Sequence, residues 1–205
     1  MEKSKFSPLH SRTPAPLYSP ALFLDRDGVI IENCANYVRS WADVAIYPQA
    51  VRALAYIRHT PFKIILVTNQ SAVGRGIITL EMAQAINERL LAVVTEGNGR
   101  IDDVFMCPHA PEDRCDCRKP QPGLLLQAAQ KHHIDLSRSF MIGDALTDLQ
   151  AGTAAGVRQV ILLRTGRGTA QLQKPEATRF HPLTVYESLE TAVQALSTIL
   201  LPNGA

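Results

Sequence analysis

Residues 21–28 read Ala-Leu-Phe-Leu-Asp-Arg-Asp-Gly, a short apolar run that passes directly into charged residues. Four more apolar runs of strand length follow along the chain, at residues 63–67, 104–106, 140–142 and 160–163. Helix-length segments separate these runs, and we expect helices to begin near Pro48, Thr79, Pro122, Ala145 and Tyr186. Strands that alternate with helices form crossover connections, so the sequence predicts an α/β fold whose mostly parallel central sheet has helices on both faces.

Length and composition favour one soluble globular domain. The chain has 205 residues, of which 46% are hydrophobic, and its net charge of +2 gives no reason to expect a nucleic-acid or membrane partner. No apolar run approaches the roughly 20 residues that cross a bilayer, and the N-terminus lacks the apolar segment of a secretion signal. We therefore expect a cytoplasmic protein with a flexible, proline-containing tail at residues 1–20 and a single domain at residues 21–200.

Polar, reactive residues follow four of the five predicted strands. In chain order they are Asp25 and Asp27, then residues 68–71, then Cys107 onward, and finally Asp144 with Asp148. Open parallel sheets bind ligands beyond the carboxyl ends of their strands, so these side chains should meet in one site. Two carboxylates this close repel each other unless a cation lies between them, and a third arrives from another strand end. Carboxylates and water suit Mg²⁺, so the sequence predicts a magnesium site.

Four segments in this order resemble the motifs of the haloacid dehalogenase (HAD) superfamily of phosphohydrolases. They are residues 24–28, 67–71, 118–120 and 143–148. The resemblance runs from residue 21 to about residue 168 and implies a Rossmann-like HAD fold. Only about 20 residues separate Asp27 from Pro48, too few for a separate cap domain, so we expect the site to be open.

The resemblance implies a phosphatase that works through an aspartyl-phosphate. Asp25 is then the nucleophile, and Asp27 is the general acid and base. It also implies that Mg²⁺ is held by the Asp25 carboxylate, the Asp27 main-chain carbonyl and Asp144. Asp148 then bonds a metal-bound water.

Phosphoryl oxygens need cations and hydrogen-bond donors, and the resemblance assigns this role to Lys119, the Thr68 hydroxyl and main-chain amides around Asn69. Arg118 contributes to substrate recognition, and Arg75 and Arg39 are further cations near the expected mouth of the site. The full set of expected substrate contacts is Asn36, Tyr37, Thr68, Asn69, Gln70, Ser71, Arg75, Arg118 and Lys119.

A cysteine cluster precedes the Arg-Lys-Pro motif. Cys107, His109, Cys115 and Cys117 have the pattern C-x-H-x5-C-x-C. Three thiolates and one imidazole complete a tetrahedral zinc site and leave no position for a catalytic water. A disulfide in a reducing cytosol is the poorer account and does not explain the histidine. We expect a structural Zn²⁺ that stiffens the loop at residues 107–117 and thereby fixes the phosphate-binding residues after it.

Within the superfamily, the zinc loop, Arg-Lys-Pro and the Leu-Arg-Thr-Gly segment at residues 163–166 resemble the D-glycero-D-manno-heptose-1,7-bisphosphate 7-phosphatases. The histidinol-phosphate phosphatases share the loop and remain an alternative. An alternative of another class is a zinc-stabilised binding module without catalysis. The presence of Asp25, Asp27, Lys119 and Asp144 argues against the binding module.

The sequence departs from the heptose enzymes at two places. Ala145 stands where those enzymes often carry lysine after the motif IV aspartate, so one cation beside the phosphate or metal is missing. The loop between Asp27 and Tyr37 is one residue longer, which leaves its substrate contacts open. The resemblance implies a phosphorylated sugar as the partner of a monomeric enzyme.

Overall fold

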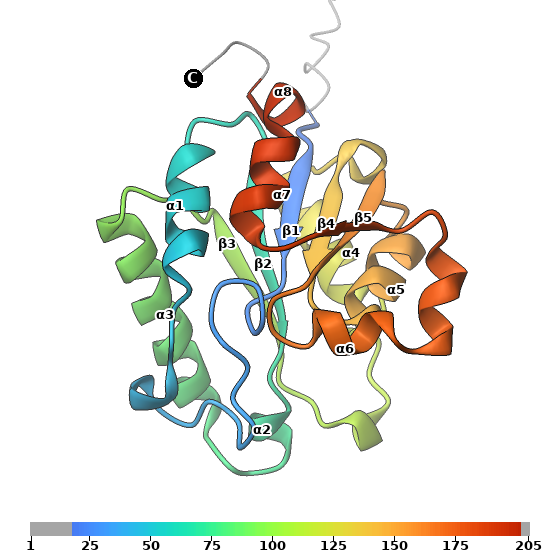
Figure 1. Ribbon diagram of the computed structural model, residues 1–205. Helices are drawn as coiled ribbons and strands as arrows, with labels where there is room; N and C mark the ends of the chain where they lie inside the picture. Colours follow the sequence, from blue (N-terminus) through green and yellow to red (C-terminus); the bar gives the residue numbers. More distant parts are fainter. Residues whose placement is uncertain (1–17, 202–205) are drawn as a thin grey trace, which may run out of the picture.

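A six-stranded parallel sheet forms the centre of the computed structural model, which describes residues 18–201 (Figure 1). The strands are β1 (Ala21–Leu24), β2 (Lys63–Asn69), β3 (Asp103–Cys107), β4 (Phe140–Gly143), β5 (Gln159–Leu163) and β6 (Thr184–Tyr186). Their order in the sheet is β3-β2-β1-β4-β5-β6, and all five pairings are parallel. The predicted α/β fold is confirmed. The sequence prediction lacked β6 because this three-residue strand is only partly buried and has no apolar run.

Eight α-helices connect the strands or follow them within the described residues. They are α1 (Pro48–Tyr56), α2 (Ser71–Gly74), α3 (Leu80–Glu96), α4 (Gly123–His132), α5 (Leu146–Ala155), α6 (Gly168–Leu172), α7 (Leu189–Ala195) and α8 (Ser197–Leu200). Thr79 caps α3 through its side chain, which accepts a hydrogen bond from the Met82 amide as a threonine N-cap does. The helix expected to begin near Tyr186 is present but begins at Leu189, with Ser188 as its cap, because Tyr186 itself ends β6.

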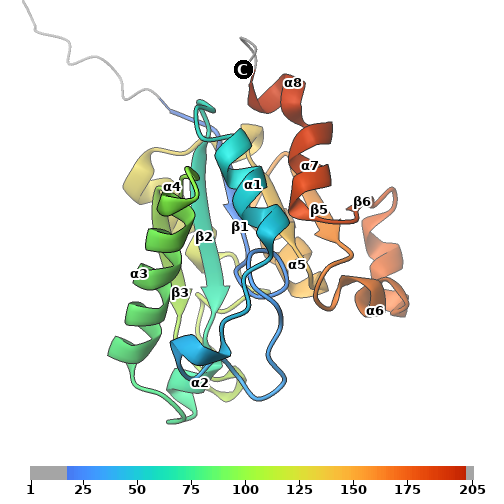
Figure 2. The same cartoon turned by 60° about the vertical axis from the view of Figure 1, so that its left-hand side comes forward.

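Helices cover both faces of the sheet, as Figure 2 shows. On β1, Leu22 and Leu24 face a core shared with α1, α3 and α7, whereas Ala21 and Phe23 face a core shared with α4 and α5. All four side chains are fully buried, as expected of a central strand in a parallel sheet. Packing on both faces therefore fixes the position of β1, and with it the position of the residues that follow Leu24.

No separate cap domain lies between β1 and α1. That connection holds a 3-10 helix (Trp41–Asp43) and a bridge between Ile31 and Ile46, and it runs beside the carboxyl ends of the strands. The absence of a cap domain in this connection agrees with the prediction from the loop length.

Near the start of the described residues, Ser19 forms a parallel bridge with Ile134. The tail expected at residues 1–20 lies mostly outside the described part of the chain. Among residues 18–201, no helix is both long enough and apolar enough to cross a membrane.

Candidate active site

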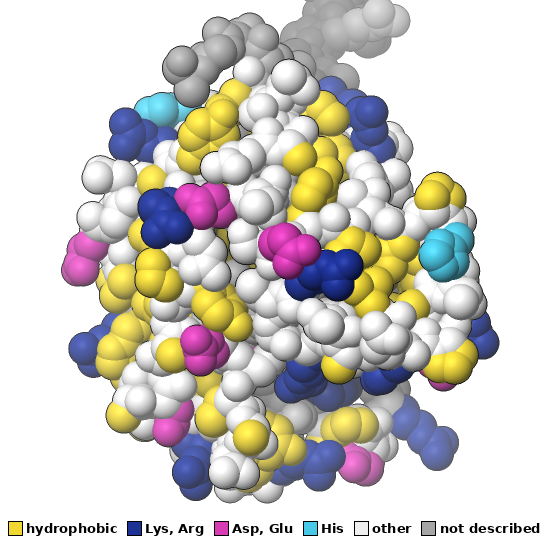
Figure 3. Space-filling model, viewed as in Figure 1, with side chains coloured by type: hydrophobic (Ala, Val, Ile, Leu, Met, Phe, Trp, Pro, Cys, Tyr) yellow, Lys and Arg dark blue, Asp and Glu magenta, His cyan; other side chains and the backbone are white. Residues whose placement is uncertain are grey.

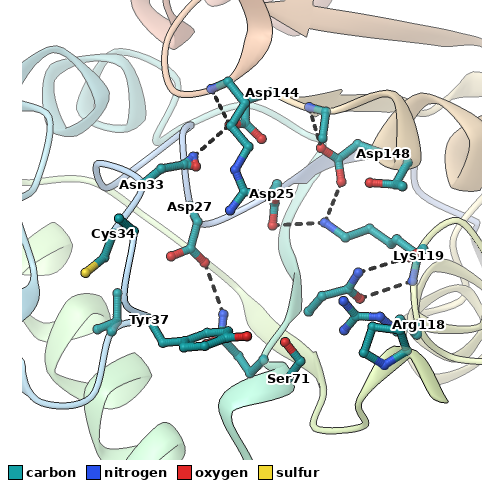
Figure 4. A pocket seen from close by; sticks show the side chains of 18 of the residues that line it. Asp25, Asp27, Asn33, Cys34, Tyr37, Ser71, Arg118, Lys119, Asp144 and Asp148 are labelled. Carbon is teal, nitrogen blue, oxygen red and sulfur yellow. Dashed lines mark hydrogen bonds and ion pairs between the residues drawn. The ribbon is translucent and has the colours of Figure 1, made fainter. Parts of the chain in front are cut away.

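The carboxyl ends of the central strands open onto a cavity of about 440 Å³ (Figure 4). Its lining includes four carboxylates, those of Asp25, Asp27, Asp144 and Asp148. The cations in its lining are Arg75, Arg118, Lys119 and Arg167. Figure 3 shows lysine and arginine side chains gathered at the lower end of the molecule, toward which the strands point in Figure 1. The lining brings together residues that follow β1, β2 and β4, whereas Cys107, which ends β3, is not part of it.

Lys119 is buried between two of these carboxylates. Its Nζ lies 2.9 Å from Asp25 Oδ1 and 2.7 Å from Asp148 Oδ1, and it donates to the Val67 carbonyl at 2.8 Å. Burial lowers the pKa of Lys119, but the carboxylates of Asp148 and Asp25 outweigh it and hold this pKa above its usual value. The site therefore contains a permanently charged ammonium at a fixed position.

Even with this lysine, the carboxylates outnumber the buried cations beside them. Burial raises the pKa of Asp25 to about 8, with Lys119 opposing the rise and Asp148, Asp144 and Asp27 adding to it. Burial likewise raises the pKa of Asp144 to about 6, against the lowering effect of the Arg167 amide. Burial is the main cause of both shifts, and the neighbouring carboxylates add to them. Carboxylate oxygens of Asp25, Asp144 and Asp148 lie within 4.8 Å of one another, close enough for one divalent cation to contact all three. Oxygen donors of this kind fit Mg²⁺.

Asp144 is enclosed on several sides. Its Oδ2 accepts hydrogen bonds of 2.8 Å from Asn33 Nδ2 and from the Arg167 amide. A Cβ added to Gly28 would lie 2.0 Å from this oxygen, and one added to Gly166 would lie 2.3 Å from it. Gly28 also has a φ of +82°, which glycine adopts readily. The two glycines therefore leave the space that the Asp144 carboxylate occupies.

Asp27 is held by side chains from two loops. Gln70 Nε2 donates to its Oδ2 at 3.0 Å, a contact drawn as a dashed line in Figure 4, and Arg26 Nε donates to the same oxygen at 3.1 Å. Arg26 Nη2 also donates to Oδ1 at 3.2 Å. The Asp27 side chain remains 23% exposed, so its carboxyl can still reach a molecule in the cavity.

Three residues proposed from the sequence occupy other places than expected. Thr68 is fully buried and lies behind the lining, where its hydroxyl accepts a hydrogen bond from Gln70. Asn36 is exposed and is not among the lining residues, although its neighbours Ala35 and Tyr37 are. Arg39, named as a cation near the mouth, also lies outside the lining.

Asn69 lines the cavity, but its side chain binds the backbone of Lys119. Its Oδ1 accepts from the Lys119 amide at 3.1 Å, and its Nδ2 donates to the Lys119 carbonyl at 3.0 Å. The Asn69 side chain therefore holds both the backbone N–H and the backbone C=O of Lys119. Asn69 thus positions the lysine that the sequence analysis assigned to the phosphoryl group.

The outer wall is formed by the loop after β1, by Arg75, and by Pro111, Arg118 and Lys119. Arg75 pairs with the exposed Glu112 at 3.2 Å, and Arg118 Nη1 donates to the His109 carbonyl at 3.1 Å. Arg118 is thereby tied to the cysteine loop. Both arginines keep further N–H groups for an anion, because a guanidinium carries five donors.

The cysteine loop brings its four expected metal ligands together. Sγ of Cys117 lies 3.2 Å from Sγ of Cys107 and 3.4 Å from Sγ of Cys115, and the His109 Nδ1 lies 3.3 Å from Sγ of Cys117. A tetrahedral zinc site with bonds of about 2.3 Å has sulfur–sulfur edges of about 3.8 Å, so the cluster is slightly tighter than a filled site. No disulfide joins these cysteines.

The thiols also lack a compensating charge. Burial and the neighbouring thiols hold the pKa of Cys117 above its usual value, whereas hydrogen bonds from the Arg118 amide and Cys117 bring that of Cys115 down to about 7 despite burial. Three thiolates cannot coexist at this distance without a cation. The donor set and its geometry therefore fit Zn²⁺.

Sequence reasoning missed Arg26, Asn87 and Arg167. Arg167 follows β5, so the rule applied to the other strand ends would have found it if extended to the fifth strand. Arg26 lies between the two aspartates already singled out, but nothing in a single sequence shows that its side chain turns inward. Asn87 belongs to a helix whose other inward residues are mostly apolar, and only the folded structure shows its partner.

Comparisons with known proteins agree with this geometry. A family model described as "HAD-hyrolase-like" matches residues 116–192. The D-glycero-beta-D-manno-heptose-1,7-bisphosphate 7-phosphatase of Pseudomonas aeruginosa is 37% identical over 154 residues, which cover 75% of this chain and 86% of that protein. The Escherichia coli protein of the same name is 36% identical over 155 residues, which cover 72% of this chain and 81% of that protein.

A solved structure is also similar. It is the crystal structure of D,D-heptose 1.7-bisphosphate phosphatase from B. bronchiseptica complexed with magnesium and phosphate. The TM-score is 0.80 at 32% identity, and the alignment covers 88% of this chain and 99% of the other.

Proposed function

Because this chain belongs to the HAD-like hydrolases, in the family of the heptose-1,7-bisphosphate 7-phosphatases, we propose that it removes the 7-phosphate of D-glycero-β-D-manno-heptose 1,7-bisphosphate. The observation that carries the proposal is the pairing of Asp25 with the buried Lys119 at 2.9 Å in a cavity that also contains Asp27 and Asp144. This arrangement supplies a nucleophile, a cation for the transferred group, and a second carboxyl for proton transfer.

In the first step, an Asp25 oxygen attacks phosphorus, and the bond from phosphorus to the sugar oxygen breaks. Asp25 Oδ1 is held by the Arg26 amide at 2.7 Å and by Lys119, so Oδ2 is the oxygen that no hydrogen bond from the described residues engages. Asp27 gives its proton to the departing sugar oxygen, because an alkoxide is a poor leaving group. The products are an aspartyl-phosphate and a free hydroxyl on the sugar.

In the second step, a water molecule attacks the phosphorus of the aspartyl-phosphate. Asp27, now a carboxylate, takes a proton from that water, and the Asp25 carboxylate leaves. Lys119 remains beside Asp25 throughout and stabilises the negative charge that accumulates on the phosphoryl oxygens. The enzyme ends with both aspartates in their starting protonation states.

The cluster of Asp25, Asp144 and Asp148 fits Mg²⁺, and we propose that Asp25, Asp144 and the Asp27 carbonyl would hold the ion, with Asp148 bonding a metal-bound water. When bound, Mg²⁺ neutralises phosphoryl oxygens and relieves the repulsion among the carboxylates. Burial raises the pKa values of Asp25 and Asp144, and a bound cation would offset that effect on both carboxyls. Asp148 also accepts from the Ala145 amide at 3.0 Å, so α5 positions it.

A bisphosphate needs cations away from the reacting group. Arg75, Arg118 and Arg167 lie in the wall of the cavity, and we propose that they receive the phosphate that is not removed. Arg167 lies in the same cavity as Ala145 and offers a positive charge where the lysine of other heptose enzymes is absent. The lack of a cap domain leaves the mouth open to a seven-carbon sugar.

The cysteine loop supports the same site from outside. We propose that Cys107, His109, Cys115 and Cys117 bind one structural Zn²⁺. Cys117 directly precedes Arg118 and Lys119, so a metal that fixes the cysteine also fixes the backbone of both cations. We also propose that the enzyme is a monomer and that it acts in the cytoplasm on a phosphorylated sugar.

The substrate is tested by measuring phosphate release from heptose bisphosphate and from histidinol phosphate, side by side, with and without Mg²⁺. We expect a clear preference for the β-anomer of the bisphosphate and a product that keeps its 1-phosphate, which phosphorus NMR detects. Asp25→Asn, purified in the same way, controls for contaminating phosphatases. A preference for histidinol phosphate contradicts the heptose assignment. Absence of turnover on every phosphate monoester would support the non-catalytic binding module instead.

A further inference from the structure

Arg26 is a buried cation whose guanidinium lies beneath the cavity. Its side chain is 1% exposed, and it is not among the residues that line the cavity. Nε lies 3.1 Å from Asp27 Oδ2, Nη2 lies 3.1 Å from Oδ2 and 3.2 Å from Oδ1, and Nη1 donates to Asn87 Oδ1 at 2.8 Å. All three guanidinium nitrogens are therefore engaged, in the forked geometry that suits a carboxylate.

Asn87 is the side chain that holds this guanidinium in place. It belongs to α3, is 5% exposed, and lies on the same buried face as Ile86 and Leu90. Its Nδ2 has only a weak acceptor, the sulfur of Met106 at 3.6 Å. A buried amide on an apolar helix face costs stability unless it is well bonded. Of the two side-chain hydrogen bonds of Asn87, the one from Arg26 at 2.8 Å is therefore the stronger.

We propose that Arg26, held by Asn87, is a positioning residue that aims the Asp27 carboxyl at the leaving oxygen of the substrate. The inference rests on the proposed function, in which Asp27 is the general acid. Arg26 cannot touch a molecule in the cavity, so it acts through Asp27. Asp27 is partly exposed, and without the fork its carboxyl is held within the described residues by Gln70 alone.

The contacts also select the oxygen that delivers the proton. Asp27 Oδ2 receives hydrogen bonds from Gln70 at 3.0 Å and from Arg26 Nε at 3.1 Å, whereas Oδ1 receives one of 3.2 Å from Arg26 Nη2. Oδ1 therefore keeps a lone pair for the proton that passes to the sugar oxygen. Once that proton has left, the resulting carboxylate faces the Arg26 cation, which stabilises it.

The test compares two classes of substrate in Asn87→Ala, Asn87→Asp and Arg26→Lys. p-Nitrophenyl phosphate has a leaving group that needs little protonation, whereas glycerol phosphate and the sugar bisphosphate depend on the acid. We expect Asn87→Ala to lower kcat for the alkyl phosphates by about tenfold, with KM unchanged and p-nitrophenyl phosphate turnover within threefold of wild type, because a small misalignment affects proton transfer most. Asn87→Asp keeps the acceptor for Nη1 and should restore the wild-type ratio of the two rates.

Arg100→Lys is the matched control. The Arg100 guanidinium is also partly buried, but it donates to the carbonyls of Arg58, Thr60 and Phe62, away from the cavity. It should lower thermal stability without changing the ratio of alkyl to aryl turnover. If a folded Asn87→Ala enzyme loses both activities equally, or changes only KM, the positioning role is overturned. If the wild-type enzyme hydrolyses glycerol phosphate but not the heptose bisphosphate, the proposed substrate is overturned. The role of Arg26 can still be tested in that case by comparing glycerol phosphate with p-nitrophenyl phosphate.

Discussion

Substitution of Gly28 by alanine should damage the site while leaving the fold in place. The new Cβ would lie 2.0 Å from Asp144 Oδ2 and 2.8 Å from Asn33 Nδ2, which donates to that same oxygen. Ordinary van der Waals contact begins at 3.4 Å, so the carboxylate must retreat by the difference, roughly 1.4 Å. Gly166 limits this retreat on another side, because its Cα also faces Asp144 Oδ2. A Cβ added to Gly166 would lie only 2.3 Å from that oxygen.

The expected cost has two parts. Alanine at a positive φ costs about 1–2 kcal/mol of folding stability. Misplacement of a catalytic group by about 1 Å lowers the rate by about 100-fold, which corresponds to about 2.7 kcal/mol of activation free energy. Gly156→Ala separates the two parts, because Gly156 has a nearly identical φ of +79° and a Cβ there meets nothing within 4 Å.

The assay measures thermal unfolding, kcat/KM and the Mg²⁺ concentration that gives half-maximal activity for both variants. Both should lose similar stability, but only Gly28→Ala should lose about 100-fold in kcat/KM and require more Mg²⁺. If Gly28→Ala keeps activity within threefold of Gly156→Ala, then Asp144 is not held where the argument requires, and the reasoning fails.

Four further results are expected. Asp25→Asn should abolish turnover with the fold intact, as measured by phosphate release and circular dichroism, and residual turnover would exclude Asp25 as the nucleophile. The pKa of Asp25, raised from 3.8 to about 8, means that the folded, metal-free protein keeps a proton that the unfolded chain has released, so stability falls as pH rises through that window. Urea unfolding with EDTA at pH 5 and pH 8 should show a shallower fall in Asp25→Asn than in wild type, and equal slopes would contradict the shift. Cys115→Ser should lose one bound zinc by metal analysis and lose activity through Arg118 and Lys119, and a zinc-free variant with full activity would refute the stiffening role. Asp27→Asn should slow alkyl phosphates far more than p-nitrophenyl phosphate, and equal losses would count against Asp27 as the acid.

The strand ends were the most predictable part of the molecule. Alternation of apolar runs and helical segments predicted the parallel sheet, and the rule that ligands bind beyond the carboxyl ends of strands predicted that Asp25 and Asp144 lie in one site. β6 and α6 were not predicted because they are short and partly exposed, so tertiary contacts rather than local pattern determine them.

Side-chain direction was the part that sequence could not supply. The Thr68 hydroxyl was assigned to the phosphoryl group, but in the structure it accepts a hydrogen bond from Gln70, and the side chain of the next residue, Asn69, holds the Lys119 backbone, which the sequence did not indicate. Arg26 illustrates the same limit, because an arginine between two aspartates in a loop is equally compatible with solvent exposure. Burial decides such cases, and burial depends on residues such as Asn87 that are distant in the chain.

The central position of β1 has a consequence for the order in which the protein is made. β1 carries the catalytic loop near the start of the chain, yet one of its edges pairs with β4, and the Ala21 amide donates to Ser139 Oγ across 118 residues. The Thr165 hydroxyl that binds the Gly28 carbonyl follows later still. A growing chain therefore displays an unpaired strand edge until most of the domain has left the ribosome. Catalytic competence and protection from aggregation arrive together, late in synthesis.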